Sequence, residues 1–137
     1  IEILRQRSRP YLFSNSLPPS VVNAGIRMFD MMSETTELQE KLHSNKDYFI
    51  GEMKKIGFDI KPTDSAICAV MLYDAKKAQD FATKLLEEGI YVIGFSYPVV
   101  PKDQARVRVQ ISAGHEKEHL DTALKAFKKI GKEMNMV

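Results

Sequence analysis

Hydrophobic and polar positions alternate strictly between residues 106 and 112, with the period of a β-strand. One face of this predicted strand carries Val107, Val109 and Ile111, and the other carries Arg106, Arg108, Gln110 and Ser112. Ile90–Ile93 is a short β-rich run between Gly89 and Gly94, and Ile67–Leu72 is a continuous apolar run of strand length. The pattern therefore predicts three strands in the second half of the chain.

Other stretches show the three-and-four spacing of amphipathic helices. Residues 1–9 predict the end of a helix that Pro10 stops, followed by an irregular segment, and Ser16 is expected to cap the next helix. That helix would hold Pro18 and Pro19 in its first turn and continue to Met32. Further helices are predicted over residues 38–56 with Gly57 as C-cap, over residues 75–86 with Asp74 as N-cap, and over residues 116–134. The order α-α-β-α-β-β-α predicts an α+β domain, a small sheet covered by helices in two layers.

Composition places the chain among soluble globular domains. The 137 residues suit one domain, with 44% hydrophobic and 28% charged residues. The net charge of +2 arises from 20 basic and 18 acidic residues, which indicates no nucleic-acid partner. No apolar run is long enough to span a membrane. The single cysteine, Cys68, lies in an apolar run and has no partner for a disulfide, so we expect a reducing, cytoplasmic setting.

Three short motifs offer chemistry, each with a structural alternative. His115-Glu116-Lys117-Glu118-His119 has the H-E-x-x-H spacing of zinc proteases, but acidic residues at a helix start also complement the helix dipole. Residues 94–96 begin like a nucleophile elbow, but the second glycine that this motif requires is replaced by Pro98. Ser14, Asn15 and Ser16 are candidate phosphate donors near a helix N-terminus, or ordinary capping residues.

The polar face of the predicted strand at 106–112 is the strongest candidate site. Its two arginines stand beside a loop that contains Phe95, Tyr97 and Pro98. An arginine fork matches a carboxylate in a bidentate manner, so this face could bind an anion. The alternative is a solvated strand face with no ligand.

Three segments together resemble one family of enzymes. RSRPYLFSNSLPP (Arg7–Pro19), ICAVML (Ile67–Leu72) and GIYVIGFSYPVVPKDQARVRVQISAGH (Gly89–His115) are similar to the α-oxoamine synthases. These are pyridoxal 5'-phosphate (PLP) enzymes of the aspartate-aminotransferase fold. The resemblance implies that residues 1–137 form the small C-terminal domain of a longer enzyme, with residues 1–19 as the connecting segment. The isoleucine at position 1, where a methionine would begin a complete protein, fits this expectation.

The resemblance also implies roles for particular residues. Arg108 matches the family arginine that binds the amino-acid carboxylate, and Tyr97 and Pro98 match a mobile loop that closes over the substrate. Phe13 and Ser14 match positions that reach into the neighbouring active site of a homodimer, Ser14 toward the cofactor phosphate. Asn15 is expected to support the same turn. No lysine of this chain matches the Schiff-base position, so no catalytic residue is assigned.

The branch of the family whose sequences these three segments resemble most condenses glycine with acetyl-CoA to 2-amino-3-oxobutyrate and CoA. The resemblance thus implies glycine and acetyl-CoA as substrates, PLP as cofactor and a homodimeric, cytoplasmic enzyme. Two alternatives stay open at this point. One is a sister enzyme that uses another amino acid or a longer acyl-CoA, and the other is a free-standing, non-catalytic domain that binds a small molecule.

Overall fold

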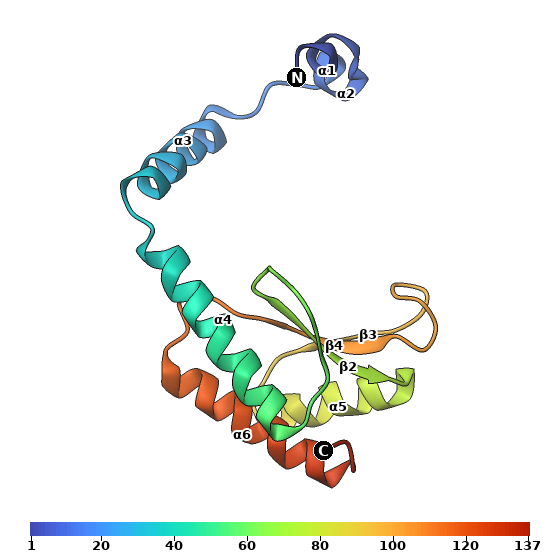
Figure 1. Ribbon diagram of the computed structural model, residues 1–137. Helices are drawn as coiled ribbons and strands as arrows, with labels where there is room; N and C mark the ends of the chain where they lie inside the picture. Colours follow the sequence, from blue (N-terminus) through green and yellow to red (C-terminus); the bar gives the residue numbers. More distant parts are fainter. The chain divides into compact units, whose positions relative to one another are not determined.

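A computed structural model describes residues 1–137, which form two compact units, residues 1–36 and residues 37–137. Figure 1 shows the chain with its helices and strands labelled. The smaller unit contains α1 (Glu2–Arg7), α2 (Arg9–Phe13) and α3 (Pro19–Glu34), none of which contains a buried residue. None of the helices combines the length and the hydropathy that crossing a membrane would require.

Three sequence predictions for the smaller unit are wrong. One is the irregular segment after Pro10, because α2 includes its first residues, Tyr11–Phe13. The first helix ends at Arg7, and Pro10 does not stop it but lies in the first turn of α2. A proline is tolerated there because the first turn leaves its N–H groups without intrahelical partners. Ser16 does not cap α3: the N-cap is Pro18, and no side chain caps this helix. Pro19 occupies its first position, as the two prolines led us to expect.

The larger unit is a four-stranded antiparallel sheet with helices on one face (Figure 1). Its strands are β1 (Ile60–Lys61), β2 (Ile67–Tyr73), β3 (Ile93–Phe95) and β4 (Ala105–Gln110), in the spatial order β1-β2-β4-β3. Its helices are α4 (Glu37–Ile56), α5 (Ala75–Glu87) and α6 (Lys117–Glu133). The predicted two-layer α+β architecture is confirmed, and the short strand β1 is an addition to the predicted order.

The prediction of a strand over Ile90–Ile93 is wrong in its bounds. The chain is irregular from Ile90 to Val92, and β3 begins at Ile93, where Ile93 pairs with Arg108 and Phe95 pairs with Arg106 of β4. Val92 is buried all the same, so the apolar pattern marked burial and not strand pairing. Strand β4 is as predicted, and it lies between β2 and β3.

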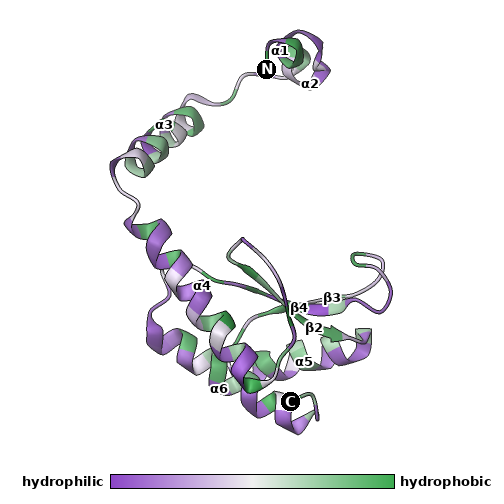
Figure 2. Cartoon of the chain, in the orientation of Figure 1, coloured by the Kyte–Doolittle hydropathy of each residue, from purple (hydrophilic) through white to green (hydrophobic).

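The core lies between the sheet and its three helices. Four phenylalanine rings, those of Phe49, Phe58, Phe81 and Phe127, meet with centroids 5.6–6.0 Å apart. Edge-to-face and tilted contacts at such distances add to the stability that burial provides. In Figure 2 strand β2 is largely hydrophobic, whereas α4, α5 and α6 show both hydrophobic and hydrophilic positions. The core therefore fixes the sheet from one side and leaves its other face open.

The helix ends in this unit agree with the sequence. Gly57 follows α4 with φ of 116°, in the region that favours glycine, and its N–H bonds to the carbonyl of Met53 at 3.2 Å. The Asp74 carboxylate accepts a hydrogen bond from the Lys77 N–H at 2.7 Å and so caps α5. Helix α6 has Glu116 as its N-cap and Met134 as its C-cap.

Candidate substrate-binding site

Arg108 lies on the open face of the sheet, in the middle of an interior strand. Its backbone pairs with Ala69 of β2 on one side and with Ile93 of β3 on the other. Because side chains alternate along a strand, the buried Val107 points toward the helices and Arg108 points away from them. The structure thus confirms that the two faces of β4 are apolar and polar, as the alternation predicted.

A shallow pocket of about 290 Å³ adjoins this arginine. It is lined by Ile67, Ala69, Phe95, Val99, Val100, Arg106 and Arg108. The guanidinium carbon of Arg108 lies 4.7 Å from the centroid of the Phe95 ring, within the range of a cation–π contact. Arg108 is exposed and forms no ion pair or side-chain hydrogen bond in this chain. The N–H groups of its fork are therefore free to bind an anion.

The loop between β3 and β4 borders the same pocket. It turns where the N–H groups of Val99 and Val100 bond to the carbonyl of Ser96, at 2.9 and 3.2 Å. Val100 is buried and anchors the loop, while Tyr97 and Pro98 are exposed. The ammonium group of Lys102 lies 5.5 Å from the centroid of the Tyr97 ring. Tyr97 and Pro98 thus lie at the exposed end of a loop whose base lines the pocket.

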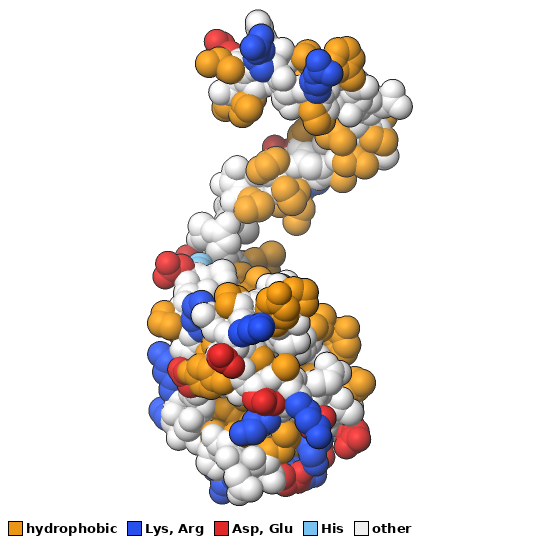
Figure 3. Space-filling model, turned by 90° about the vertical axis from the view of Figure 1, so that its right-hand side faces the viewer, with side chains coloured by type: hydrophobic (Ala, Val, Ile, Leu, Met, Phe, Trp, Pro, Cys, Tyr) orange, Lys and Arg blue, Asp and Glu red, His pale blue; other side chains and the backbone are white.

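The other predicted site residues lie in the smaller unit. Phe13 ends α2 with 82% of its surface exposed, and Ser14 and Asn15 follow it in an exposed, irregular segment. The side chains of Ser14 and Asn15 make no hydrogen bond within the chain, so their polar groups are free. In Figure 3 hydrophobic side chains gather over the helices of this unit, whereas charges of both signs are mixed over the larger one.

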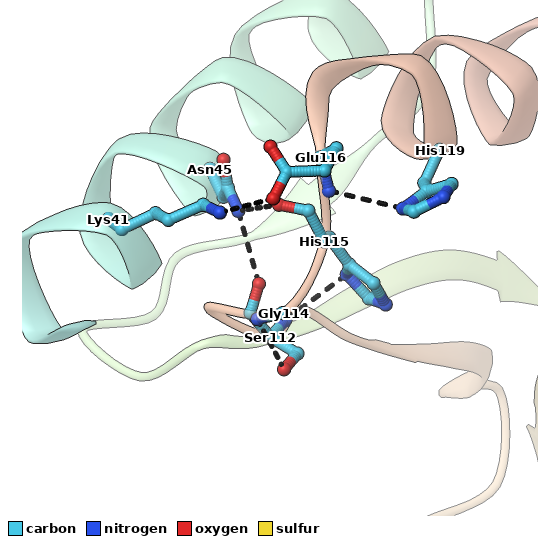
Figure 4. Close-up of polar contacts among 7 residues, drawn as sticks. All are labelled: Lys41, Asn45, Ser112, Gly114, His115, Glu116 and His119. Carbon is cyan, nitrogen blue, oxygen red and sulfur yellow. Dashed lines mark hydrogen bonds and ion pairs between the residues drawn. The ribbon is translucent and has the colours of Figure 1, made fainter.

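The H-E-x-x-H stretch serves as a turn and a helix cap in this structure. His115 lies ahead of α6, so the two histidines do not share one helical face, and no group of three metal-binding side chains exists. The Nδ1 atom of His115 accepts the Ser112 N–H at 3.2 Å, and Nδ1 of His119 accepts the Glu116 N–H at 3.1 Å (Figure 4). Each Nδ1 is an acceptor, so the proton of the neutral ring lies on Nε2.

Helix α4 holds this turn in place at the end of β4. The Asn45 side chain donates hydrogen bonds to the carbonyls of Ser112 and His115, at 3.1 and 2.8 Å (Figure 4). Lys41 of the same helix forms an ion pair with Glu116 at 2.5 Å. This hydrogen bond and the charge of Lys41 lower the pKa of the Glu116 carboxyl. The strand that carries Arg108 is thereby fixed at its C-terminal end.

Phe95 is the residue of this site to which sequence analysis gave no role. The end of the apolar run at Gly94 predicts that Phe95 lies in the loop. A period of two through Ile93 and Phe95 would have placed both residues on one face of a strand, and the register in the structure shows that this face carries Arg108 and Arg106.

Comparison with known proteins defines the family. Residues 1–127 match the aminotransferase class I and II family. The chain is 50% identical over all 137 residues to 2-amino-3-ketobutyrate coenzyme A ligase of Escherichia coli (strain K12), and covers 34% of that protein. It is 45% identical over 137 residues to 8-amino-7-oxononanoate synthase of Thermoanaerobacter pseudethanolicus, covering 35% of it. A mitochondrial 2-amino-3-ketobutyrate coenzyme A ligase of Mus musculus is 46% identical over 132 residues, 96% of this chain and 32% of that protein.

Solved structures agree with this result. A high-resolution structure of SPT with PLP superposes with a TM-score of 0.92 at 34% identity, over 99% of this chain and 35% of that one. Serine palmitoyltransferase of Sphingomonas wittichii gives a TM-score of 0.90 at 29% identity, over 99% of this chain and 35% of that one. The chain belongs to the aminotransferase class I and II family. Within it, these relatives place the chain among the α-oxoamine synthases, and it spans about a third of the length of the curated relatives it matches.

Proposed function

We propose that this chain is the C-terminal part of a PLP-dependent glycine C-acetyltransferase. In this proposal, residues 1–19 connect to a cofactor-binding domain and the remainder forms the small domain. The complete enzyme condenses glycine with acetyl-CoA to give 2-amino-3-oxobutyrate and CoA. The observation that carries the proposal is Arg108, an exposed and unpaired cation beside a pocket on a rigid interior strand. The 50% identity to 2-amino-3-ketobutyrate coenzyme A ligase supports the choice of substrates.

The residues present fit part of a PLP site. Ser14 and Asn15 offer an exposed hydroxyl and an exposed amide that no group of this chain engages, and both can donate to a phosphate. No lysine lines the pocket beside Arg108, so we propose that the lysine that holds the cofactor lies outside residues 1–137. The bound cofactor supplies an electron sink for bond cleavage at the glycine α-carbon.

The chain's own residues position the substrate. Arg108 binds the glycine carboxylate through its two parallel N–H groups, which fixes the direction of the α-carbon bonds. Tyr97 and Pro98 close over the bound substrate and exclude water. Phe13, Ser14 and Asn15 reach the active site of a second copy, so the enzyme is a homodimer. The apolar side chains exposed on α1–α3 support this arrangement, because an apolar surface of that kind marks an interface.

We also propose that the enzyme works in the cytoplasm. Cys68 is buried and has no second cysteine with which to form a disulfide in this chain. A thiol of this kind fits a reducing compartment.

A sister activity is the second candidate, and the similarity to 8-amino-7-oxononanoate synthase and serine palmitoyltransferase favours it. Such an enzyme would join another amino acid to a longer acyl chain. Residues 1–137 discriminate little between the two candidate activities. The described pocket adjoins Arg108, where we propose that the substrate carboxylate binds, and we assign no acyl-binding site to this chain.

Steady-state assays of the full-length protein decide between the candidates. CoA release is measured with glycine, alanine and serine, each against acetyl-CoA, hexanoyl-CoA and palmitoyl-CoA. We expect the highest kcat/KM with glycine and acetyl-CoA. A higher value with another pair would establish the sister activity, and no CoA release from any pair would contradict both candidates.

A further inference from the structure

The Arg108 guanidinium lies over the Phe95 ring on the open face of the sheet. The guanidinium carbon lies 4.7 Å from the ring centroid, and both side chains line the same pocket. Their strands are neighbours, with Ile93 directly opposite Arg108 and Phe95 opposite Arg106. Phe95 is thus the diagonal neighbour of Arg108, at a separation that an aromatic side chain can bridge.

The contact with Phe95 uses no hydrogen-bond acceptor, so the N–H donors of Arg108 remain available. A guanidinium is planar, and its N–H donors all lie in that plane. The guanidinium carbon lies over the Phe95 ring, and no oxygen of this chain accepts a hydrogen bond from these donors. No carboxylate of this chain competes for them, since Arg108 takes part in none of the ion pairs. The ring therefore restricts the side chain while the bidentate edge stays available.

Phe95 is itself held firmly. It is half-buried at the end of β3, and its backbone is paired with Arg106 of β4. The preceding Gly94 lies against the backbone of α5, where an added Cβ would be 3.0 Å from the Ala78 carbonyl oxygen. The buried Val100 anchors the loop that follows. The ring thus gives the long and otherwise mobile arginine a fixed surface.

We propose that Phe95 is a positioning residue for substrate binding: its ring holds Arg108 in the orientation that receives the amino-acid carboxylate. This inference rests on the proposed function of Arg108. Ordering an arginine restricts many rotamers, and a stack formed before the substrate arrives reduces that cost at the moment of binding. The effect therefore belongs to substrate affinity, and the chemical step at saturation is left nearly unchanged.

The test compares Phe95→Leu with Phe95→Tyr in the full-length, cofactor-loaded enzyme. Leucine keeps an apolar side chain but removes the ring, whereas tyrosine keeps the ring. We expect Phe95→Leu to raise KM for glycine about two- to tenfold, as the loss of one cation–π contact implies, with kcat within about twofold of wild type. Phe95→Tyr should retain the wild-type KM. Tyr91→Leu, which removes an exposed aromatic outside this pocket, is the matched control and should also retain it.

A second readout does not depend on turnover. In the cofactor-free full-length protein, labelling of Arg108 by phenylglyoxal is followed by mass spectrometry. Removal of the ring uncovers a face of the guanidinium, so Phe95→Leu should label faster than wild type and Phe95→Tyr should not. If Phe95 had a purely structural role, its loss would not change the labelling rate of Arg108 selectively among the arginines. Equal labelling rates in all three proteins, or a Phe95→Tyr variant as impaired as Phe95→Leu, would overturn the inference.

Arg108→Ala separates this inference from the proposed function. If Arg108→Ala raises KM for glycine and Phe95→Leu does not, the positioning role of Phe95 is wrong and the carboxylate role of Arg108 stands. If Arg108→Ala has the wild-type KM, both are wrong.

Discussion

Gly94 occupies the point where strand β3 passes closest to helix α5. A Cβ atom at this position would lie 3.0 Å from the carbonyl oxygen of Ala78 and 3.3 Å from its carbon. These are backbone atoms of a helix, so they cannot move aside as a flexible side chain would. Glycine is therefore required here by the close approach of the two elements, and this approach also sets the position of Phe95.

We predict that Gly94→Ala destabilises the domain by about 1–3 kcal/mol, the usual cost of overpacking. Urea unfolding of the 137-residue chain measures this free energy. Gly51→Ala is the matched control: Gly51 lies within α4 with open space around its added Cβ, so alanine should be neutral or stabilise the helix by up to about 1 kcal/mol. Equal unfolding free energies for the two variants would contradict this account of Gly94.

Sequence analysis identified Arg108 but gave no role to its neighbour Phe95, and the reason is physical. The exposure of Arg108 follows from alternation within one strand, which is a local property. The stack with Phe95 depends on the register between β3 and β4, and that register is set by a nine-residue loop and by packing on α5. Nothing in the local pattern at residues 93–95 specifies which residue of β4 will lie opposite.

Helices α4 and α6 are joined by a buried interface and by a polar contact at its margin. The Tyr48 hydroxyl of α4 donates a hydrogen bond to the Asp121 carboxylate of α6 at 2.5 Å. This bond, together with desolvation and the negative charges of Asp121 and Glu52, raises the pKa of Tyr48 from 10.0 to about 12. The protonated phenol is thus favoured in the folded state.

A raised pKa in the folded state gives stability that is complete below the unfolded pKa and declines above it. We therefore predict that the contribution of Tyr48 to stability is present below about pH 10 and is lost as the pH rises through about 12. Ultraviolet titration of the five tyrosines should show a late step that Tyr48→Phe removes and that Asp121→Asn moves to lower pH.

Two other tyrosines, Tyr73 and Tyr91, determine how the titration of Tyr48 is controlled. Tyr73, whose pKa is also raised by its hydrogen bond to Asp59, contributes its own high-pH signal, so each variant is compared with wild type. Tyr91→Phe, which removes an exposed tyrosine, should leave the late step in place. A late step that survives in Tyr48→Phe at full amplitude would show that the Tyr48–Asp121 contact does not shift the titration.

The elements themselves were largely predictable where the determinants are local. Gly57, Asp74 and Glu116 mark helix ends through their own backbone or side-chain hydrogen bonds, and all three were placed correctly. The errors concern elements that depend on distant partners. The run at residues 90–93 was apolar enough for a strand, but only its last residue has β4 alongside to pair with.

The helices near the N-terminus illustrate the same limit. Local pattern suggested that Pro10 ends a helix, yet proline suits both the end of one helix and the first turn of the next. These helices have no core of their own that would decide between the two. The apolar periodicity of α3 predicts that one face of this helix is buried. In residues 1–137 nothing covers that face, and its apolar side chains are exposed.

The two units of the whole molecule should differ strongly in local stability. Every buried residue lies in residues 37–137, and the helices of residues 1–36 lack the tertiary packing that supplies most helical stability in proteins. We predict that amide hydrogens of α1–α3 exchange much faster than those of β2, β4 and α6 in the 137-residue chain. Hydrogen exchange read by mass spectrometry or NMR measures the difference. Protection of α3 equal to that of β4, in a chain shown to be monomeric, would contradict this division.

The kinetic role of Arg108 tests the central claim most directly. In the full-length enzyme we expect Arg108→Ala to lower kcat/KM for glycine roughly 10- to 100-fold, mainly through a higher KM, since a charge-assisted bidentate contact is lost. Arg108→Lys should recover only part of the loss, because the ammonium group lacks the planar fork. Arg106→Ala, at the half-buried neighbouring arginine of the same face, should have a milder effect. Wild-type glycine kinetics in Arg108→Ala would contradict the account.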